Sequence, residues 1–572
     1  MNPFKKLVEH FQTHPANYLS ILPALFLLSG FWFIPGYIQL LDLTVGPALA
    51  SKAQGFTGFD YLLHWLAMAG VLETGQKVIL VVVLWLATLG CYRLLDKYPS
   101  WTKISGSLLY IINPFVYYRM ITGQINVIII LALLPWALRY IIALLETSNT
   151  KNCLRVGVIT AAMGLFAPHG LLILAIIYAI AFIAYLWKTP TWQKKLFSLP
   201  YLLIILAAVL MVNSFWIIPA IQGKGYVGEY LTDISHPIQN TIYQTITDSN
   251  WGLGYNVLGL YGFWAENNFF NLSNKSFAPW WPYLLPIILF VIILGALSTW
   301  KQYREFSSSR KTLIVVLSSA ALLGFFLSLG IASPLTKSPM EWLYRHFVPL
   351  QGFRDSHKFL VITIIGYGYF YAAGLEYLAK KTEIINRWKL SGAVLGIGIL
   401  IPFLYTPGVF GNFHGVVQPA VFPQSWATVQ TFLNNDQTDY RVLVFPWHQY
   451  QSYAFLNNKK VANLATVFFN NNLIVGDNVE FGVYSTSRRK ESKITDLFLV
   501  LPNDKKEKMA TTMAYNLNVK YIILTKEVDW NTYLWLDKAD GLEKVFDSKE
   551  ISLYENKRWK TNNSRVINQQ PD

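Results

Sequence analysis

Long apolar runs, separated by short polar connections, fill the first 409 residues of the chain. A membrane-spanning helix needs about 20 predominantly apolar residues, and most of these runs approach that length. We count about eleven of them, at 17–41, 77–95, 104–118, 125–146, 156–168, 170–187, 197–218, 281–299, 312–331, 358–379 and 390–409. The pattern predicts a polytopic α-helical membrane domain over residues 1–409, with about eleven transmembrane helices.

Shorter periodic patterns replace the long runs in the rest of the chain. Trp426 and Val429 recur at helical spacing, whereas residues 440–445 and 520–524 are rich in Val, Ile and Tyr, as strands are. Helices that alternate with such strands are typical of an α/β domain or an α+β domain. We therefore predict a soluble α/β domain over residues 410–572.

Composition supports the membrane assignment. The chain is 53% hydrophobic and only 14% charged, and its mean hydropathy is +0.34. Soluble globular domains carry about 25% charged residues. This composition excludes a disordered chain and an ordinary soluble enzyme. The two cysteines, Cys91 and Cys153, indicate neither a disulfide scaffold nor a CxxC metal site.

Alternate connections between the apolar runs are basic, which predicts an orientation. Residues 1–409 hold 28 Lys and Arg against 15 Asp and Glu, and 19 of the 28 cations fall on one side if the runs alternate across the membrane. By the positive-inside rule this side, which includes the N-terminus, is cytoplasmic. We predict an inner-membrane protein without a cleavable signal peptide. The segments expected outside the cytoplasm are the loops 42–76, 219–280 and 332–357 and the C-terminal domain.

Common cofactor and nucleophile motifs are missing from the sequence. It contains no GxxxxGKS or GxxxxGKT phosphate loop, no GxGxxG motif after a strand, no GxSxG elbow and no HExxH pair among its nine histidines. We therefore expect neither a cofactor nor a metal site. Any chemistry is expected from single polar residues that gather at the outer membrane face.

Three acids lie in the predicted first outer loop, and they are the candidates for a general base. Asp42 directly follows the first apolar run, where an apolar surround would favour a raised pKa and a role in proton transfer. The alternative is an interfacial acid that ends a helix. Asp60 has the pattern of an N-terminal helix cap, and Glu73 is the third acid of the loop.

Cations precede the tenth apolar run on the outer side, where topology disfavours them. Arg354 and Lys358 would share a face if this stretch is helical, and two cations at headgroup level suit a phosphate. Arg119 and His169 fall on the same side of the membrane. The alternatives are cations that snorkel to the interface and a local pair between Arg354 and Asp355.

Two further stretches on the outer side carry polar and aromatic groups. A proline after Asn113 breaks the third apolar run, and the chain continues to Gln124 before the next run begins. Broken backbone at membrane depth lines a cavity or is buried in protein, although a simply kinked helix is the alternative. The loop 219–280 ends near Trp264 and Glu266, which suit sugar contacts or an aromatic interface belt.

These features together resemble the GT-C superfamily of polyprenyl-phosphate-sugar-dependent membrane glycosyltransferases. The likeness is closest to the alpha-(1→3)-arabinofuranosyltransferase group and related polytopic membrane proteins. It rests on Asp42, Asn113-Pro114, Gly123-Gln124, Leu134-Pro135-Trp136 and the run Phe353-Arg354-Asp355-Ser356-His357-Lys358-Phe359. That run is similar to the Phe-Arg-Glu-Pro-x-Lys-Phe pattern of the group and keeps both basic positions. Many members carry paired acids in the first loop, where this chain has Asp42 alone.

The resemblance implies a GT-C membrane domain with an extracytoplasmic C-terminal domain and an inverting transfer from a polyprenyl-phosphate sugar. It implies Asp42 as the base, Arg354, Lys358 and Arg119 on the donor phosphate, and substrate contacts from His169, Gln124, His357, Trp264 and Glu266. The acceptor would be a glycan, a lipid or a protein in cell-envelope glycan synthesis. Two other functions stay open. One is a transporter, flippase or polymerase of lipid-linked glycans, and the other is a catalytically silent assembly protein of the cell envelope.

Overall fold

The computed structural model describes residues 19–52, 55, 57–188, 199–222, 243–266, 273–384, 388–478, 487 and 489–561. The described residues divide into two compact units. Unit 1 takes its residues from Met1–Trp32, Gly55–Tyr61 and Lys77–Val417, and unit 2 from Phe33–Gln54, Leu62–Gln76 and Gln418–Asp572. Unit 2 therefore combines most of the predicted first outer loop with the predicted C-terminal domain.

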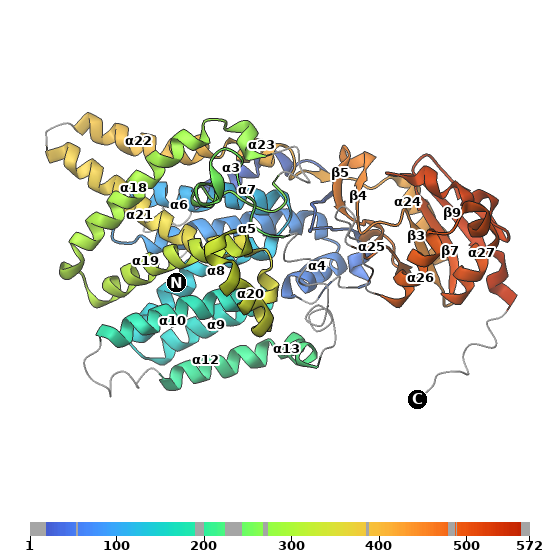
Figure 1. Cartoon of the computed structure of the whole chain (residues 1–572), viewed down its shortest axis with the longest axis horizontal. Coiled ribbons are helices and arrows are strands. Elements are labelled where there is room, and N and C mark those ends of the chain that lie inside the picture. Colours follow the sequence, from blue (N-terminus) through green and yellow to red (C-terminus); the bar gives the residue numbers. More distant parts are fainter. Residues whose placement is uncertain are drawn as a thin grey trace, which may run out of the picture. The chain divides into compact units, whose positions relative to one another are not determined.

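Unit 1 is built almost entirely of helices (Figure 1). Two helices contain residues of both units, α4 (Gly58–Met68) and α5 (Leu72–Leu94). The longer helices of unit 1 are α6 (Ser100–Ile111), α8 (Ile125–Glu146), α9 (Thr150–Phe166), α10 (Gly170–Lys188), α12 (Leu199–Val212), α18 (Trp281–Lys301), α19 (Ser308–Leu329), α20 (Pro334–His346), α21 (Leu360–Ile384) and α22 (Trp388–Tyr405). The shorter ones are α3 (Leu22–Leu27), α7 (Pro114–Ile121), α13 (Ser214–Ile221), α16 (Gly252–Leu258), α17 (Asn274–Phe277) and α23 (Phe410–His414).

Helix α21 is the most enclosed element of unit 1. It packs against α6, α18 and α19, and 94% of the 18-residue apolar window in the overlapping candidate span Ser356–Thr382 is buried. Glycines permit the close approach: a Cβ on Gly295 of α18 would lie 1.9 Å from the Phe370 carbonyl oxygen, and one on Gly374 of α21 would lie 2.0 Å from that of Val291. Small residues at helix crossings are typical of membrane bundles.

The number of spanning helices is smaller than the sequence analysis predicts. Among the described residues, six helices are long and apolar enough to cross a membrane, or up to eight if each of two sharply bent helix pairs is one span. The described part of run 17–41 contains α3, a 3-10 turn and two strand residues, but no helix of spanning length. Run 104–118 is divided between α6 and α7, and run 156–168 lies mostly in α9, which has 17 residues. Hydropathy averages over these breaks, which is why about eleven runs were counted.

The predicted break after Asn113 is a capped helix boundary. The Asn113 side chain accepts a hydrogen bond from the Val116 backbone N–H at 3.0 Å, and it donates to the carbonyl oxygens of Leu109 and Tyr110. Pro114 occupies the first position of α7, where a missing N–H costs nothing. Every residue of α7 is buried. The break therefore re-aims a buried helix, and this is what positions Arg119.

Unit 2 has a mixed five-stranded sheet in the order β6-β3-β7-β9-β8, whose strands lie side by side in Figure 1. Strand β3 (Arg441–Phe445) pairs in parallel with β6 (Asn472–Ile474) and β7 (Val519–Thr525), whereas β9 (Ile551–Asn556) pairs antiparallel with β7 and β8 (Leu542–Asp547). The helices are α24 (Gln424–Asn434), α25 (Ala465–Phe468), α26 (Lys490–Leu499) and α27 (Asn503–Asn516). The α/β prediction for this part of the chain is confirmed.

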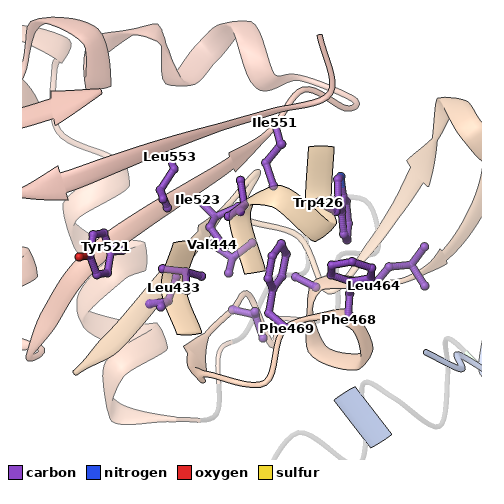
Figure 2. Packing of buried hydrophobic residues seen from close by; sticks show 14 of the residues in the cluster. Trp426, Leu433, Val444, Leu464, Phe468, Phe469, Tyr521, Ile523, Ile551 and Leu553 are labelled. Carbon is purple, nitrogen blue, oxygen red and sulfur yellow. The ribbon is translucent and has the colours of Figure 1, made fainter. Parts of the chain in front are cut away.

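The sheet of unit 2 carries apolar side chains on both faces. Figure 2 shows one cluster, in which Trp426 of α24 lies near Phe468 and Phe469, with Val444 and Ile523 from the sheet beside them. The Trp426 and Phe468 rings meet edge to face at 5.3 Å. A second cluster forms from the alternate residues of the same strands. Burial on both faces explains why β3 and β7 read as nearly continuous apolar runs.

The first-loop residues of unit 2 join the rest of that unit through short strands. Strand β1 (Tyr37–Ile38) pairs antiparallel with β2 (Pro419–Ala420), and the Ala462 N–H donates to the Leu41 carbonyl oxygen at 3.1 Å. Ala462 ends β5 (Lys459–Ala462), which forms a hairpin with β4 (Tyr450–Tyr453). Asp42 therefore follows extended backbone rather than a spanning helix. The premise that it emerges directly from a span is wrong.

Candidate functional site

A buried ion pair links two distant segments of unit 1. Arg119 Nη1 lies 2.5 Å from Asp355 Oδ2, and the two side chains are 0% and 5% exposed. Arg119 Nη2 also lies 3.3 Å from Asp355 Oδ1, so the contact is two-pronged. Burial alone would raise the pKa of Asp355, but the charge and hydrogen bonds of Arg119 hold that pKa below its usual value. The pair is therefore charged on both sides and neutral overall.

Two residues singled out in the sequence complete the surroundings of this ion pair. Arg119 Nη1 donates to Gln124 Oε1, and Arg119 Nη2 lies 3.1 Å from His357 Nδ1. His357 Nε2 lies 3.1 Å from the Tyr261 carbonyl oxygen, which can only accept a hydrogen bond. The imidazole thus carries its proton on Nε2 and leaves Nδ1 to accept from Arg119. The structure brings Arg119, Gln124 and His357 into one cluster.

Aromatic rings cover the guanidinium of Arg119. Its central carbon lies 4.4 Å from the ring centre of Phe263 and 5.0 Å from that of Phe115. The Nε atom of Arg119 is buried and has no hydrogen-bond partner among the described residues. Water-free burial of this kind strengthens electrostatic interactions. Asp355 and Phe263 were not assigned this role from the sequence, because nothing local relates them to Arg119.

The run that contains Arg354 and Lys358 is not an α-helix. It consists of two 3-10 turns, Val348–Phe353 and Ser356–Phe359, that meet at Asp355. The condition for Arg354 and Lys358 to share a helical face is therefore not met. The alternative of a local pair is not what forms either, since Asp355 pairs with Arg119. Asp355 instead ties the middle of this run to α7.

Arg354 and Lys358 are both half-buried. The Arg354 guanidinium lies over the Tyr243 ring at 4.5 Å, and that ring meets Trp264 edge to face at 4.7 Å. Lys358 Nζ donates to the Gly352 carbonyl oxygen at 3.2 Å. Trp264 is thus brought close to Arg354 through Tyr243.

His169 lies in the break between α9 and α10, where the sequence predicted an interruption. Its ring meets Phe353 edge to face at 5.9 Å. Burial, together with the positive charges of Lys358 and Arg119, lowers the pKa of His169 to about 3, so its imidazole is neutral at physiological pH. Its Nε2 atom is buried without a hydrogen-bond partner among the described residues. His169 therefore lies in the field of two of the predicted phosphate-binding cations.

Glu266 belongs to a second ionic cluster in unit 1. Its Oε1 lies 3.2 Å from Lys275 Nζ, and its Oε2 accepts from the Gly262 N–H at 3.1 Å. Lys275 Nζ also contacts Asp248 Oδ2 at 2.7 Å. Lys275 was not singled out in the sequence, although it lies in a predicted outer loop that also carries Asp248 and Glu266. Neighbouring parts of that loop, 223–242 and 267–272, lie outside the described residues.

Asp42 belongs to unit 2 and is exposed there. The Tyr450 hydroxyl of β4 donates to Asp42 Oδ1 at 3.1 Å. Nearby in the same hairpin, Lys459 Nζ donates to the Gln39 carbonyl oxygen at 3.1 Å, and burial lowers the pKa of Lys459 to about 8. The first-loop acid therefore shares its surroundings with residues from the C-terminal part of the chain.

The other two first-loop acids differ from Asp42 in their placement. Asp60 Oδ2 accepts hydrogen bonds from the Thr57 N–H at 2.9 Å and from the Thr57 hydroxyl at 2.6 Å, a contact that closes the start of α4. Asp60 is the third residue of α4 and bonds back to Thr57, so it closes the helix start from inside the first turn and does not occupy the N-cap position predicted for it. Glu73 lies in the first turn of α5. Within the described part of the chain, no group of three or more His, Cys, Asp and Glu side chains could hold a metal ion.

No protein-family model and no curated protein sequence matches the chain. Solved structures do. Arabinofuranosyltransferase AftD from Mycobacteria matches with a TM-score of 0.64 at 12% sequence identity, over 95% of this chain and 40% of that chain. A mutant of AftD matches with a TM-score of 0.63 at 11% identity, over 95% and 41%. ArnT from Cupriavidus metallidurans bound to undecaprenyl phosphate matches over 95% of this chain and 98% of that chain at 11% identity. Its TM-score of 0.48 is too low to support a common fold.

The chain therefore has a fold similar to that of the arabinofuranosyltransferase AftD, which agrees with the fold that the resemblance predicted. At 12% identity the likeness concerns the fold alone. The chain spans about 40% of the length of the AftD chain that it matches.

Proposed function

We propose that this chain is a membrane glycosyltransferase that moves a sugar from a polyprenyl-phosphate donor to a glycan, lipid or protein outside the cytoplasm. The fold supports the class of enzyme. The observation that carries the proposal is the buried Arg119–Asp355 pair, which anchors the run bearing Arg354 and Lys358. Burying an ion pair away from water costs free energy. Because Asp355 of this pair lies between the cations Arg354 and Lys358, we infer that the pair belongs to a functional site.

Arg354 and Lys358 bind the donor phosphate in this proposal. The phosphate carries a single anionic group, and it gains negative charge as the bond to the sugar breaks. Cations that are already fixed in a half-buried site stabilise this charge without reorganisation. Tyr243 under the Arg354 guanidinium and the Gly352 carbonyl at Lys358 restrict both side chains.

Arg119 has a different part, because its contacts lie within the protein. It holds Asp355, Gln124 and His357, and through Asp355 it positions the phosphate-binding run. Gln124 and His357 support this arrangement in turn. A direct contact between Arg119 and the phosphate stays a prediction from the sequence.

Asp42 is the general base in the proposed reaction. The acceptor hydroxyl attacks the anomeric carbon from the side opposite the phosphate, so the transfer inverts that centre. The new carbon–oxygen bond forms as the bond between carbon and phosphate oxygen breaks, and the bonding electrons leave with the polyprenyl phosphate. The hydroxyl proton passes to the Asp42 carboxylate. Tyr450 donates to that carboxylate and fixes its orientation. No step requires a metal.

The remaining candidates contact the substrates. His169 has a neutral ring with a buried, unpartnered Nε2, which suits a hydrogen bond to a sugar hydroxyl. Trp264 offers an aromatic face near Arg354, and Glu266 with Lys275 shapes the adjoining turn.

The test is incubation of the purified full-length protein, in lipid nanodiscs, with a panel of polyprenyl-phosphate sugars. Mass spectrometry then measures the donor consumed and the polyprenyl phosphate released. We expect one donor to be consumed in the presence of a cell-envelope acceptor extract. Movement of an intact lipid-linked sugar across proteoliposomes, without release of polyprenyl phosphate, would favour the transporter or flippase. Binding without consumption of any donor would favour the silent assembly protein.

A further inference from the structure

A cavity lined by both charged and apolar side chains lies toward the opposite end of unit 1 from the Arg119–Asp355 pair. It has a volume of about 300 Å³ and is bounded by the C-terminal halves of α5 and α8 and the N-terminal end of α19. Helix α8 begins one residue after Gln124 and has 22 residues. At 1.5 Å per residue this is about 33 Å, close to the thickness of a bilayer core. The α8 residues that line the cavity, Arg139, Ile142 and Ala143, lie 14–18 residues beyond Ile125, which is about 21–27 Å along the helix, so the cavity is separate from the proposed donor site.

Positive charge dominates the lining of this cavity. Lys97, Arg139 and Arg310 contribute to it, and Asp96 is the carboxylate among the lining residues. Asp96 lies 4.0 Å from Arg139, and both side chains are about half exposed, so this pair is weak. Three cations against one carboxylate leave the cavity suited to an anion.

Arg310 is the cation held most firmly. Its guanidinium lies 3.8 Å from the ring centre of Phe306 and 5.3 Å from that of Tyr98. Its Nε atom is buried and has no hydrogen-bond partner among the described residues. An acceptor that enters the cavity would give this buried donor a hydrogen-bond partner that the described residues do not supply.

The same cavity also has apolar walls. Leu94, Ile142 and Leu313 line it beside the cations. A second cavity of about 140 Å³ shares Lys97, Tyr98 and Arg310 and extends to Lys380, which pairs with Glu376 at 3.1 Å. Because α5, α8 and α19 are candidate spans, their ends lie at the depth of lipid headgroups. A ligand that is complementary to both the cationic and the apolar lining of the cavity has an anionic head and an apolar tail.

We propose that this cavity binds the phosphate headgroup of an anionic phospholipid, with the acyl chains against the apolar wall. Arg310 and Lys97 hold the phosphate, and Arg139 lies at the edge. Basic pockets between helices at the cytoplasmic face recognise anionic headgroups by this chemistry. The predicted orientation places the cavity in the cytoplasmic leaflet. The proposal does not depend on the glycosyltransferase function, since neither cavity contains a residue of the candidate site.

The test is native mass spectrometry of the full-length protein after exchange into nanodiscs of phosphatidylcholine with or without phosphatidylglycerol. We expect phosphatidylglycerol to be retained, and Arg310→Gln to weaken its retention about tenfold, as one lost charge-assisted contact predicts. Lys97 is exposed, so Lys97→Gln should fold normally and tests the site even if Arg310→Gln does not fold. The matched controls are Arg304→Gln and Lys301→Gln, exposed cations at the same end of the bundle that line neither cavity.

Retention lost in Arg310→Gln and Lys97→Gln but kept in both controls would support the site. Equal loss in the controls would overturn it in favour of diffuse attraction to the basic face. Competition by inorganic phosphate as effective as that by phosphatidylglycerol would also overturn the lipid assignment and indicate a soluble phosphate ligand. Equal retention of phosphatidylcholine and phosphatidylglycerol would show that the charge has no role.

Discussion

Arg119 and Asp355 are 236 positions apart in the sequence, and their side chains meet at 2.5 Å in the interior of unit 1. Each has the other as its charge partner, and neither can reach water. Removing one member of a buried pair leaves an uncompensated buried charge, whereas replacing both members with apolar residues leaves no buried charge. Loss of one member of the pair should therefore destabilise unit 1, and the intact pair holds the run that follows Phe353 in position.

Asp355→Asn should lower the free energy of unfolding by about 3–5 kcal/mol, because it leaves the buried Arg119 charge without its partner. The measurement is denaturant unfolding of the full chain in detergent. The control is Glu341→Gln, which breaks the exposed Glu341–Arg345 pair at 3.5 Å and should cost under about 1 kcal/mol. Replacing both Arg119 and Asp355 by Met and Leu should recover part of the loss. Equal effects of Asp355→Asn and the control would contradict this account.

Arg354→Ala and Lys358→Ala should each reduce donor turnover by roughly 10²–10³-fold, since loss of one contact to developing charge costs about 2.7–4 kcal/mol. The assay is release of polyprenyl phosphate at saturating donor. Arg345→Ala serves as the control, because Arg345 is an exposed cation of α20 that pairs with Glu341 at 3.5 Å. Normal turnover in both variants would make these cations topology or packing residues.

Asp42→Asn should abolish transfer while leaving donor binding largely intact. The substitution keeps the size of the side chain and removes its ability to take a proton. Donor binding is measured by titration, and transfer by sugar incorporation into the acceptor. Normal transfer in this variant would direct attention to Glu73 and Asp60 in turn. Loss of activity with a chelator, and its recovery on addition of a metal, would instead contradict the metal-free mechanism.

Tyr450→Phe should lower kcat on the order of tenfold with little change in the donor KM. The variant removes the 3.1 Å hydrogen bond to Asp42 Oδ1, and a hydrogen bond to a charged group contributes about 1.5–3 kcal/mol. Tyr450 acts through Asp42, so the change should have no further effect in an Asp42→Asn background. A rise in KM with kcat unchanged would point to a binding role for Tyr450 and not a positioning one.

Stability should depend on pH through Lys459. Burial lowers the pKa of Lys459 from 10.5 to about 8, so the unfolded chain binds more protons between these values and stability rises with pH across that window. Lys459→Met should remove this rise. It should also stabilise the protein at pH 7 by up to about 3 kcal/mol. This gain is reduced by the free energy of the hydrogen bond from Lys459 to the Gln39 carbonyl oxygen, which the variant loses. Lys460→Met is the control that should keep the pH dependence. Denaturant midpoints at pH 7 and pH 10 make the comparison.

The sequence by itself determined the class of the protein. Apolar runs report a membrane environment directly, because a spanning helix must satisfy its backbone within a hydrophobic stretch. Local chemistry was also readable: the proline after Asn113 and the Ala167–Gly170 interruption mark real helix breaks. The strands at residues 440–445 and 520–524 were also predictable, because these residues are rich in Val, Ile and Tyr. Arg119, Gln124 and His357 were all selected, although as separate features.

Tertiary structure decided how these features combine. Hydropathy counted about eleven spans, because averaging conceals the breaks that leave six to eight. Sequence placed Asp355 beside Arg354, whereas the fold brings Asp355, at the junction of two 3-10 turns, to Arg119 of α7. Asp42 meets Tyr450 across 408 positions for the same reason. Periodicity and capping act over a few residues, but the choice of charge partners depends on which helices and strands pack together, and only the folded chain settles that.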